Sequence, residues 1–380
     1  MKRLVLVSGG HAHLSVLRVL ARMKPKDVDL TLITPSAYQH YSGMLPGWVS
    51  GHYEQTECRV DLRPLAQAAG ADLILESIVG MDAARRCVGL PDGRHVEYDF
   101  LSLDVGSEAD TSWLQTLGDK LLPIKPLDDF YLRWPKVLSE AKTKEKFKLV
   151  VVGSGAAGVE LALAAKHAFT QSSINGQVDL VASESGLLAG HSAKVKDRVL
   201  SYVERTGIHL HFHRGVGTDG AVLLSDGKRL EADCVVAATG ARAPVWLRVS
   251  GLALDDYGFI AVNRYHRSVS HANVFAAGDV CSRTDAFIQR SGVHAVHAGP
   301  VLATNLMASL SGLAARPYNP RSRSLYLLAC GPRYAIASWG RWSTEGQWVW
   351  KWKDWIDRRF LARFSTFPET KSVRLLEESR

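Results

Sequence analysis

The sequence predicts an α/β protein with two Rossmann-like nucleotide-binding domains and a small C-terminal region. A strand, a glycine-rich turn, a helix and a second strand follow one another at the N-terminus, and the same order restarts near residue 148. The 380 residues are 46% hydrophobic and 22% charged, which suits a globular chain of two or three domains.

The first unit combines a strand at 4–7, a helix from about 13 to 23 and a strand at 30–33. Its turn is a degenerate form of G-x-G-x-x-G, because Ser8 replaces the first glycine and His13 the third, while Gly9 and Gly10 remain. The second strand ends in Thr34-Pro35 and lacks the acidic residue that usually holds a ribose. An imidazole at His11 or His13 can donate a hydrogen bond to a pyrophosphate, but the sequence leaves open whether either reaches it.

The second unit has a strand at 148–152, a helix at 159–169 and a strand at 178–182. Its loop carries the full pattern at Gly153, Gly155 and Gly158, which allows a tight turn, close approach to a pyrophosphate and close helix–strand packing. The helix N-terminus would face the phosphates. Glu184, slightly beyond the strand end, is the candidate for the ribose hydroxyls. No arginine stands nearby in the sequence, which favours NADH over NADPH.

Two later strands end in further turns. The strand at 274–277 runs into Gly278-Asp279, and the strand at 234–237 runs into Ala238-Thr239-Gly240. The two glycine loops and these two turns, in this order, resemble the pyridine nucleotide-disulfide oxidoreductase superfamily over nearly the whole chain. The resemblance implies the glutathione reductase-type fold, with FAD in the first domain and NAD(P)H in the second.

The resemblance also implies the binding residues. For FAD these are Ser8, Gly9, Gly10, His11, His13, Thr34, Pro35, Met44, Leu45, Gly278, Asp279, Gly292 and Val293. For NAD(P)H they are Gly153, Gly155, Gly158, Glu184 and Gly240. The FAD-binding domain is expected at 1–115 and 250–318, and the NAD(P)H-binding domain at 116–249. Residues 319–380 form a C-terminal region that closes the flavin pocket or makes an interface.

The cysteines limit which branch of the superfamily this chain can resemble. The five cysteines are scattered and form no C-x-x-C pair, so a redox-active disulfide is excluded. Met44 stands where single-cysteine members carry their reactive thiol, and a thioether forms no thiolate. Cys281 and Cys330 are the remaining candidates near a flavin, and we interpret both as small buried hydrophobic residues. The flavin must then pass its electrons directly to an outside acceptor.

The segments 9–14, 41–47, 292–297 and 352–360 resemble type II NADH dehydrogenase and an FAD-containing NADH dehydrogenase-like subfamily associated with selenide, water dikinase. His297 stands where those relatives tend to carry arginine. The implied reaction is hydride transfer from nicotinamide to FAD, followed by transfer of two electrons to a quinone-like acceptor. Two alternatives stay open: a soluble flavoprotein reductase linked to selenium or sulfur metabolism, and a non-enzymatic, redox-regulated flavin-binding partner.

Three residues are the catalytic candidates. Glu160 would lie beside nicotinamide and flavin, unless it is a carboxylate favoured by the helix dipole. Lys125 resembles the family lysine near the flavin, with a solvated lysine as the competing view. His294 follows Gly292 on a helix whose N-terminus would face the flavin, and it could donate a proton to the acceptor. No metal site is expected, and His209, His211 and His213 are interpreted as an exposed polar strand edge.

The C-terminal region is rich in tryptophan and basic residues. Six tryptophans fall between Trp339 and Trp355, and residues 321–364 hold nine Arg and Lys against three Asp and Glu. Trp352, Trp355, Ile356, Phe360 and Phe364 follow helical spacing, which is typical of an interfacial helix. A membrane surface contacted by the segment from Trp339 to Phe364 is therefore expected, with packing on the FAD domain or a homodimer interface as alternatives.

The folds argue against nucleic acid as a partner despite the net charge of +8. The N-terminal apolar run is too short for a signal peptide, which favours a cytoplasmic protein, peripheral on the membrane if the tryptophans bind lipid.

Overall fold

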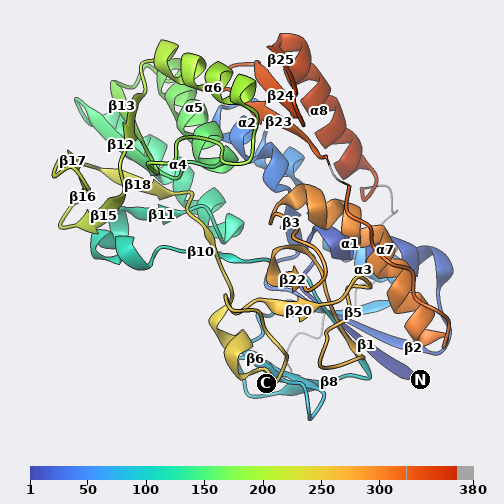
Figure 1. The fold of residues 1–380 in the computed structure, drawn as a ribbon. Helices are drawn as coiled ribbons and strands as arrows, with labels where there is room; N and C mark the ends of the chain where they lie inside the picture. Colours follow the sequence, from blue (N-terminus) through green and yellow to red (C-terminus); the bar gives the residue numbers. More distant parts are fainter. Residues whose placement is uncertain (322, 366–380) are drawn as a thin grey trace.

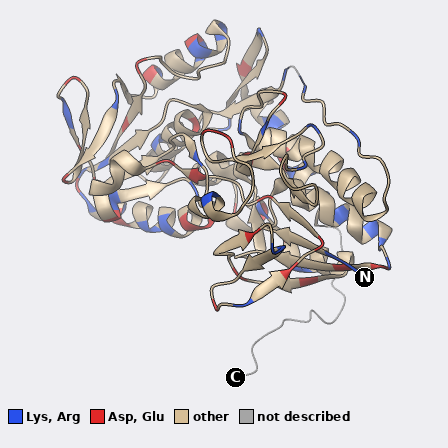
Figure 2. Cartoon of the chain, turned by 60° about the horizontal axis from the view of Figure 1, so that its bottom comes forward, with Lys and Arg blue, Asp and Glu red and all other residues tan. Residues whose placement is uncertain are grey.

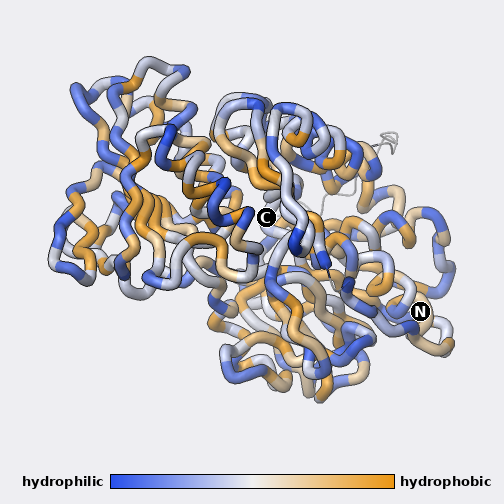
Figure 3. The backbone as a smooth tube through the Cα atoms, turned by 45° about the horizontal axis from the view of Figure 1, so that its top comes forward, coloured by the Kyte–Doolittle hydropathy of each residue, from blue (hydrophilic) through white to orange (hydrophobic). Residues whose placement is uncertain are grey.

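The computed structural model describes residues 1–321 and 323–365. The molecule has two lobes, and each lobe is built around a five-stranded parallel sheet (Figure 1). Both sheets are built from hydrophobic strands (Figure 3). Lys and Arg are interspersed with Asp and Glu over the surface (Figure 2).

The first sheet has the order β21-β9-β1-β2-β5, with all neighbours parallel. Its strands are β1 (Lys2–Val7), β2 (Val28–Ile33), β5 (Ala71–Ile74), β9 (Phe100–Leu103) and β21 (Val274–Ala276). The helices α1 (His11–Met23), α3 (Leu62–Ala69) and α7 (Gly292–Leu310) belong to the same lobe, and α1 packs against both α3 and α7. The first helix therefore begins at His11, two residues before the predicted start.

The second sheet has the order β11-β18-β12-β13-β14, again parallel. Its strands are β11 (Leu121–Pro123), β12 (Phe147–Val152), β13 (Gly176–Ala182), β14 (His209–Phe212) and β18 (Cys234–Ala237). Its helices are α4 (Leu127–Thr143), α5 (Ala156–Gln171) and α6 (Ala193–Arg205). Both predicted βαβ units are confirmed, with α5 beginning three residues earlier than expected.

Smaller strands complete both lobes. They are β3 (Tyr38–His40), β4 (Arg59–Asp61), β6 (Gly80–Asp82), β7 (Cys87–Gly89), β8 (His95–Glu97), β10 (Glu108–Ala109), β15 (Gly215–Thr218), β16 (Ala221–Leu224), β17 (Arg229–Glu231), β19 (Ala241–Arg242), β20 (Ile260–Val262) and β22 (Cys281–Arg283). The short helices are α2 (Leu45–Val49) and the 3₁₀ helices η1 (Ser42–Met44), η2 (Gln55–Cys58), η3 (Ser112–Lys120), η4 (Val245–Val249) and η5 (Gly278–Val280).

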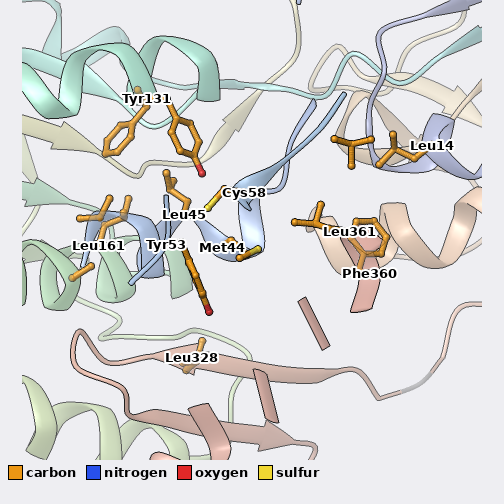
Figure 4. Packing of buried hydrophobic residues seen from close by; sticks show 14 of the residues in the cluster. Leu14, Met44, Leu45, Tyr53, Cys58, Tyr131, Leu161, Leu328, Phe360 and Leu361 are labelled. Atoms are coloured by element: carbon orange, nitrogen blue, oxygen red, sulfur yellow. The ribbon is translucent and has the colours of Figure 1, made fainter. Parts of the chain in front are cut away.

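The C-terminal region is an antiparallel sheet followed by a helix. The strands β23 (Leu325–Ala329), β24 (Ala335–Trp339) and β25 (Trp342–Gly346) precede α8 (Gln347–Ala362). One hydrophobic cluster joins this region to both lobes, since Met44, Tyr131, Leu161, Leu328 and Phe360 all belong to it (Figure 4). The C-terminal region is thus part of the core.

The predicted aromatic face of the C-terminal helix is wrong in part. Phe360 and Phe364 are buried, whereas Trp355 is 55% exposed. The reason is that α8 buries the face through Val349, Lys353 and Phe360 against the core, so the aromatic side chains are divided between that face and solvent. Among the described helices, none is long and apolar enough to span a membrane.

Candidate functional site

The carboxyl ends of β1, β2, β9 and β21 meet at one edge of the first sheet and bring Ser8, Thr34, Asp104 and Gly278 to the same region. Ser8 adopts φ 72°, a left-handed conformation that favours glycine, so the turn keeps its shape without the first glycine. Thr34 is buried directly after β2. This edge is where the dinucleotide of a Rossmann-like domain lies.

The two histidines of this turn have different roles. His13, in place of the third glycine, is fully buried and holds the backbone oxygen of Ser8 at 2.6 Å and Ser102 Oγ at 2.7 Å. Both its ring nitrogens are therefore used within the fold. The Nε2 atom of His11 is buried without a hydrogen-bond partner. Burial lowers the pKa of each imidazole to about 4, so both are neutral.

A second unpartnered imidazole nitrogen belongs to α7. His294 lies in its first turn, just after Gly292 and Val293, and its Nδ1 atom is buried without a partner. Buried polar atoms of this kind are uncommon unless a ligand satisfies them. The unpartnered nitrogens of His11 and His294, from two helix N-termini, fit a polar ligand such as FAD.

Lys125 and Asp279 form an ion pair at this site. Lys125 Nζ lies 2.6 Å from Asp279 Oδ2 and 3.0 Å from Ser107 Oγ. The lysine thus pairs with a carboxylate predicted to bind FAD, while its side chain stays 30% exposed. Met44 and Leu45 are buried beside this region in the hydrophobic cluster, where they contribute packing.

The second sheet carries a separate cavity of about 690 Å³ at the carboxyl ends of β12, β13 and β18. Four of the residues predicted to bind NAD(P)H line it, namely Gly153, Gly155, Glu184 and Gly240. Gly158 packs so closely that a Cβ atom there would clash with the Gly153 backbone oxygen. The glycine loop therefore packs the start of α5 tightly against the strand end and leaves its N–H groups facing the cavity.

A cation that lies far from the glycine loop in the sequence also lines this cavity. Arg214, which follows β14, lines the wall, and its guanidinium carbon lies 5.8 Å from the ring centre of Trp113. An arginine therefore lies at this cavity although none stands near Glu184 in the sequence, because β14 is the neighbour of β13 in the sheet. Arg214 on the wall removes the reason for preferring NADH over NADPH.

A cavity of about 890 Å³ lies between the two lobes and the C-terminal region. Its apolar wall includes Leu325, Leu327, Trp352, Ile356 and Phe360, while Val293, Val296 and His297 line it from α7. Trp339 and Trp342 lie on its wall and are about half exposed, at 53% and 46%. The cavity thus connects the start of α7 with an aromatic part of the surface.

A cluster of ionisable groups lines the same cavity. Glu160 Oε1 accepts the Ala329 backbone N–H at 2.8 Å, and burial raises the pKa of this carboxyl to about 7. Lys353 Nζ lies 2.6 Å from both Asp357 Oδ2 and the Gly43 backbone oxygen. Burial raises the pKa of the Tyr41 hydroxyl, and the nearby Asp357 adds to the rise.

Sequence reasoning found Glu160 but missed Lys353 and Asp357. Their i, i+4 spacing within residues 352–360 was the available signal, since such pairs lie on one helix face. The pair is buried, with side-chain exposures of 11% and 6%. Buried charges of this kind are costly, which makes the pair a candidate for a function.

The structure supports the interpretation as a buried residue for Cys330, whereas Cys281 is only partly buried. Cys281 Sγ faces the backbone oxygens of Ala276 and Gly278 at 3.5 Å, and burial raises its pKa to about 12. Cys330 is 1% exposed, and burial raises its pKa as well. Neither thiol is placed to form a thiolate at neutral pH.

The three histidines His209, His211 and His213 do not form the fully exposed strand edge that was expected. His211 is not exposed, because its Nε2 atom pairs with the buried Asp179 carboxylate at 2.8 Å. His209 lies 3.5 Å from the same carboxylate, and His213 lies beyond the strand end near Asp226. Within the part of the chain that the structure describes, no group of three or more His, Cys, Asp or Glu side chains is arranged to hold a metal.

Comparison with known proteins agrees with this geometry. Oxidoreductase ptaL of Pestalotiopsis fici is 24% identical over 374 residues, which cover 91% of this chain and 94% of the relative. The 3-phenylpropionate/cinnamic acid dioxygenase ferredoxin–NAD(+) reductase component of Photorhabdus laumondii is 25% identical over 207 residues, 52% of this chain and 49% of the relative. The sulfide:quinone oxidoreductase structure from Aquifex aeolicus shares the fold, with a TM-score of 0.79, 16% identity, and coverage of 96% of this chain and 91% of that one.

A family model described as pyridine nucleotide-disulphide oxidoreductase matches residues 2–300. This range contains both glycine loops and the Gly278-Asp279 turn. The chain belongs to the pyridine nucleotide-disulphide oxidoreductase family, with FAD and NAD(P)H as its cofactors.

Proposed function

We propose that this oxidoreductase transfers two electrons from NAD(P)H through FAD to a quinone-like acceptor that binds in the 890 Å³ cavity. The observation that carries the proposal is the cavity itself. Its wall is largely apolar and aromatic, it begins at the N-terminal turn of α7, and it reaches the half-exposed Trp339 and Trp342. An apolar ring with polar oxygens fits a site of this kind.

A quinone-like acceptor takes up protons when it is reduced, and the ionisable groups that line the cavity can supply them. In the overall reaction, NAD(P)H, one proton and a quinone give NAD(P)+ and a hydroquinone. FAD supplies the two-electron carrier between nicotinamide and acceptor. We infer that the Glu160 carboxyl and the Lys353 ammonium hold protons beside the acceptor oxygens, while Asp357 keeps Lys353 charged.

The absence of a reactive thiol supports direct transfer to the acceptor. Cys330 is buried and Cys281 is partly buried, desolvation raises the pKa of both thiols, and Met44 takes the place of the reactive cysteine. The FAD site offers Asp279, His11 and His294 as polar partners. Lys125 positions the Asp279 carboxylate.

The exposed tryptophans favour delivery of the acceptor from a lipid surface. Trp339, Trp342, Trp348 and Trp355 are each about half exposed, at 53%, 46%, 54% and 55%. Tryptophan and basic side chains together are typical of a membrane interface. We propose that this face lies on the membrane and that the cavity opens toward it.

The test mixes the purified holoprotein anaerobically with NADH or NADPH and then with a soluble quinone. We expect the visible flavin absorbance to fall with the nucleotide and to return with the quinone. Absorbance that does not fall would contradict the dehydrogenase. Absorbance that falls and does not return with quinone would contradict the acceptor alone.

In that last case ferredoxin is the acceptor to try next. The Photorhabdus laumondii relative is described as a ferredoxin–NAD(+) reductase component. Slow loss of absorbance with a long-lived charge-transfer band would instead support a redox-regulated binding partner.

A further inference from the structure

Asp104 follows β9 and lies between the N-terminus of α1 and the Gly278-Asp279 turn. We propose that FAD binds to the form of this chain in which the carboxyl group of Asp104 holds a proton. The proposal concerns FAD binding and does not depend on the identity of the acceptor.

The contacts of Asp104 place its carboxyl group inside the FAD site. Its Oδ2 atom accepts the backbone N–H groups of Ala12 at 2.8 Å and His13 at 3.0 Å. A Cβ atom at Gly10 would clash with this carboxyl group, and one at Gly278 would lie 2.6 Å from its Oδ1 atom. Asp104 is 4% exposed, so both segments that hold FAD close around it.

The NAD(P)H domain provides an internal comparison. Ala238 follows β18 as Asp104 follows β9, since the Ala238 N–H bonds the Val152 oxygen and the Asp104 N–H bonds the Val7 oxygen. Ala238 has no carboxyl group to reach α5. The N–H groups at the start of α5 therefore remain for phosphate, whereas two in the first turn of α1 are already bonded.

This difference has an electrostatic consequence for FAD. A helix N-terminus attracts phosphate through free N–H groups and its positive dipole end. An ionised Asp104 would cancel much of that attraction and repel the anionic diphosphate in a site of low dielectric. A protonated Asp104 removes the repulsion and can donate its O–H.

Among the titratable groups at this site, Asp104 is the one whose protonation can change when FAD binds. The titratable groups that face it or its neighbours are Asp279 of η5, His11 and His13 of α1, Cys281 of β22, His294 of α7 and Lys125 after β11. Lys125 is already paired with Asp279, burial keeps the imidazoles of His11 and His13 neutral and lowers the pKa of His294, and the thiol is protonated. Burial raises the pKa of Asp104 to about 8, and Asp279 adds to the rise.

The sign of the pH dependence follows from this pKa. Below pH 8 the free site is already protonated, so FAD binding takes up little or no proton. Above pH 8 the free carboxyl is ionised, and binding must restore the proton because the diphosphate raises the pKa further. The dissociation constant then increases about tenfold per pH unit until the pKa of the bound state is reached.

The experiment measures FAD release from the diluted holoprotein by flavin fluorescence at several pH values. For the natural chain we expect the dissociation constant to rise about tenfold between pH 7 and 9. Asp104→Asn keeps an oxygen for the two N–H groups but binds no proton, so its dissociation constant should stay within about twofold. Cys281→Ser is the matched control and should keep the tenfold rise.

Calorimetry gives a second readout that needs no variant. FAD is titrated near pH 9 into protein freed of flavin, in two buffers with different ionisation enthalpies. We expect uptake of most of one proton per FAD. No proton uptake, an unchanged dissociation constant in the natural chain, or a tenfold rise that persists in Asp104→Asn would overturn the proposal.

Discussion

Glu160 combines burial with a place on the wall of the acceptor cavity, and its pKa of about 7 makes its protonation sensitive to pH near neutrality. A raised pKa means that the carboxyl is protonated below about pH 7 and ionised above it. If it supplies a proton, quinone turnover should fall as the pH rises through 7. Glu160→Gln should lose this dependence and lower kcat by about a hundredfold.

The choice of glutamine controls for a structural effect of the substitution. Glutamine keeps an oxygen for the Ala329 N–H, so the fold and the flavin content should be unchanged. Steady-state rates with a soluble quinone, measured across the pH range, decide the matter. A variant whose pH profile matches that of the natural chain would exclude Glu160 as the proton donor.

Lys353 and Asp357 allow structural and chemical roles to be separated. Lys353→Met leaves a buried carboxylate without its cation, and we expect a loss of about 3–5 kcal/mol of unfolding free energy. The double variant Lys353→Met/Asp357→Leu should recover most of that stability, because both charges are gone. Turnover with quinone should stay low in both variants.

Denaturant unfolding and quinone kinetics are the two measurements. Recovery of both stability and turnover in the double variant would mean that the pair only joins α8 to the Gly43 backbone. Recovery of stability alone supports the proton-holding role.

At the scale of elements, β24, β25 and α8 present the exposed tryptophans. Trp339 and Trp342 face each other across the β24–β25 ladder, and Trp355 lies on the outer side of α8. Replacing these three by alanine should reduce binding to anionic vesicles at least about tenfold. The buried Trp350, changed to phenylalanine, should leave binding unchanged.

Vesicle pelleting at low and high salt is the measurement. High salt should weaken binding by screening the basic residues, while the tryptophan contribution persists. Equal pelleting of the triple variant and the natural chain would exclude this face as the membrane contact.

The local elements could be predicted from the sequence, whereas contacts between distant elements could not. Both βαβ units follow from local patterns, so strands such as β1 and β12 and their glycine loops could be located from sequence. Asp104 and Arg214 could not be assigned, because their partners lie far along the chain, and for Lys353 only the nearby Asp357 could have been read from the spacing. Asp104 meets Ala12 across 92 residues, and Lys353 meets Gly43 across 310. Such contacts depend on how sheets and helices assemble.

At the scale of the whole molecule, one hydrophobic cluster connects both nucleotide-binding lobes with the C-terminal region. Phe360 is 6% exposed and packs its ring against Tyr41 at 4.7 Å and Phe364 at 5.2 Å between ring centres. It also lies 6.3 Å from the ring of His11 at the FAD site. The C-terminal helix should therefore stabilise the FAD lobe directly.

Phe360→Ala tests this connection. Loss of a buried aromatic ring should lower the unfolding free energy by about 3–5 kcal/mol. Because the cluster is shared, flavin release and loss of helical circular dichroism should move together to a lower temperature in one transition. Leu230→Ala, in the separate cluster of the second lobe, is the control and should destabilise the chain without weakening FAD binding at low temperature. If flavin were lost from Phe360→Ala well below a second, unshifted transition, the lobes would unfold independently and the shared core would not couple them.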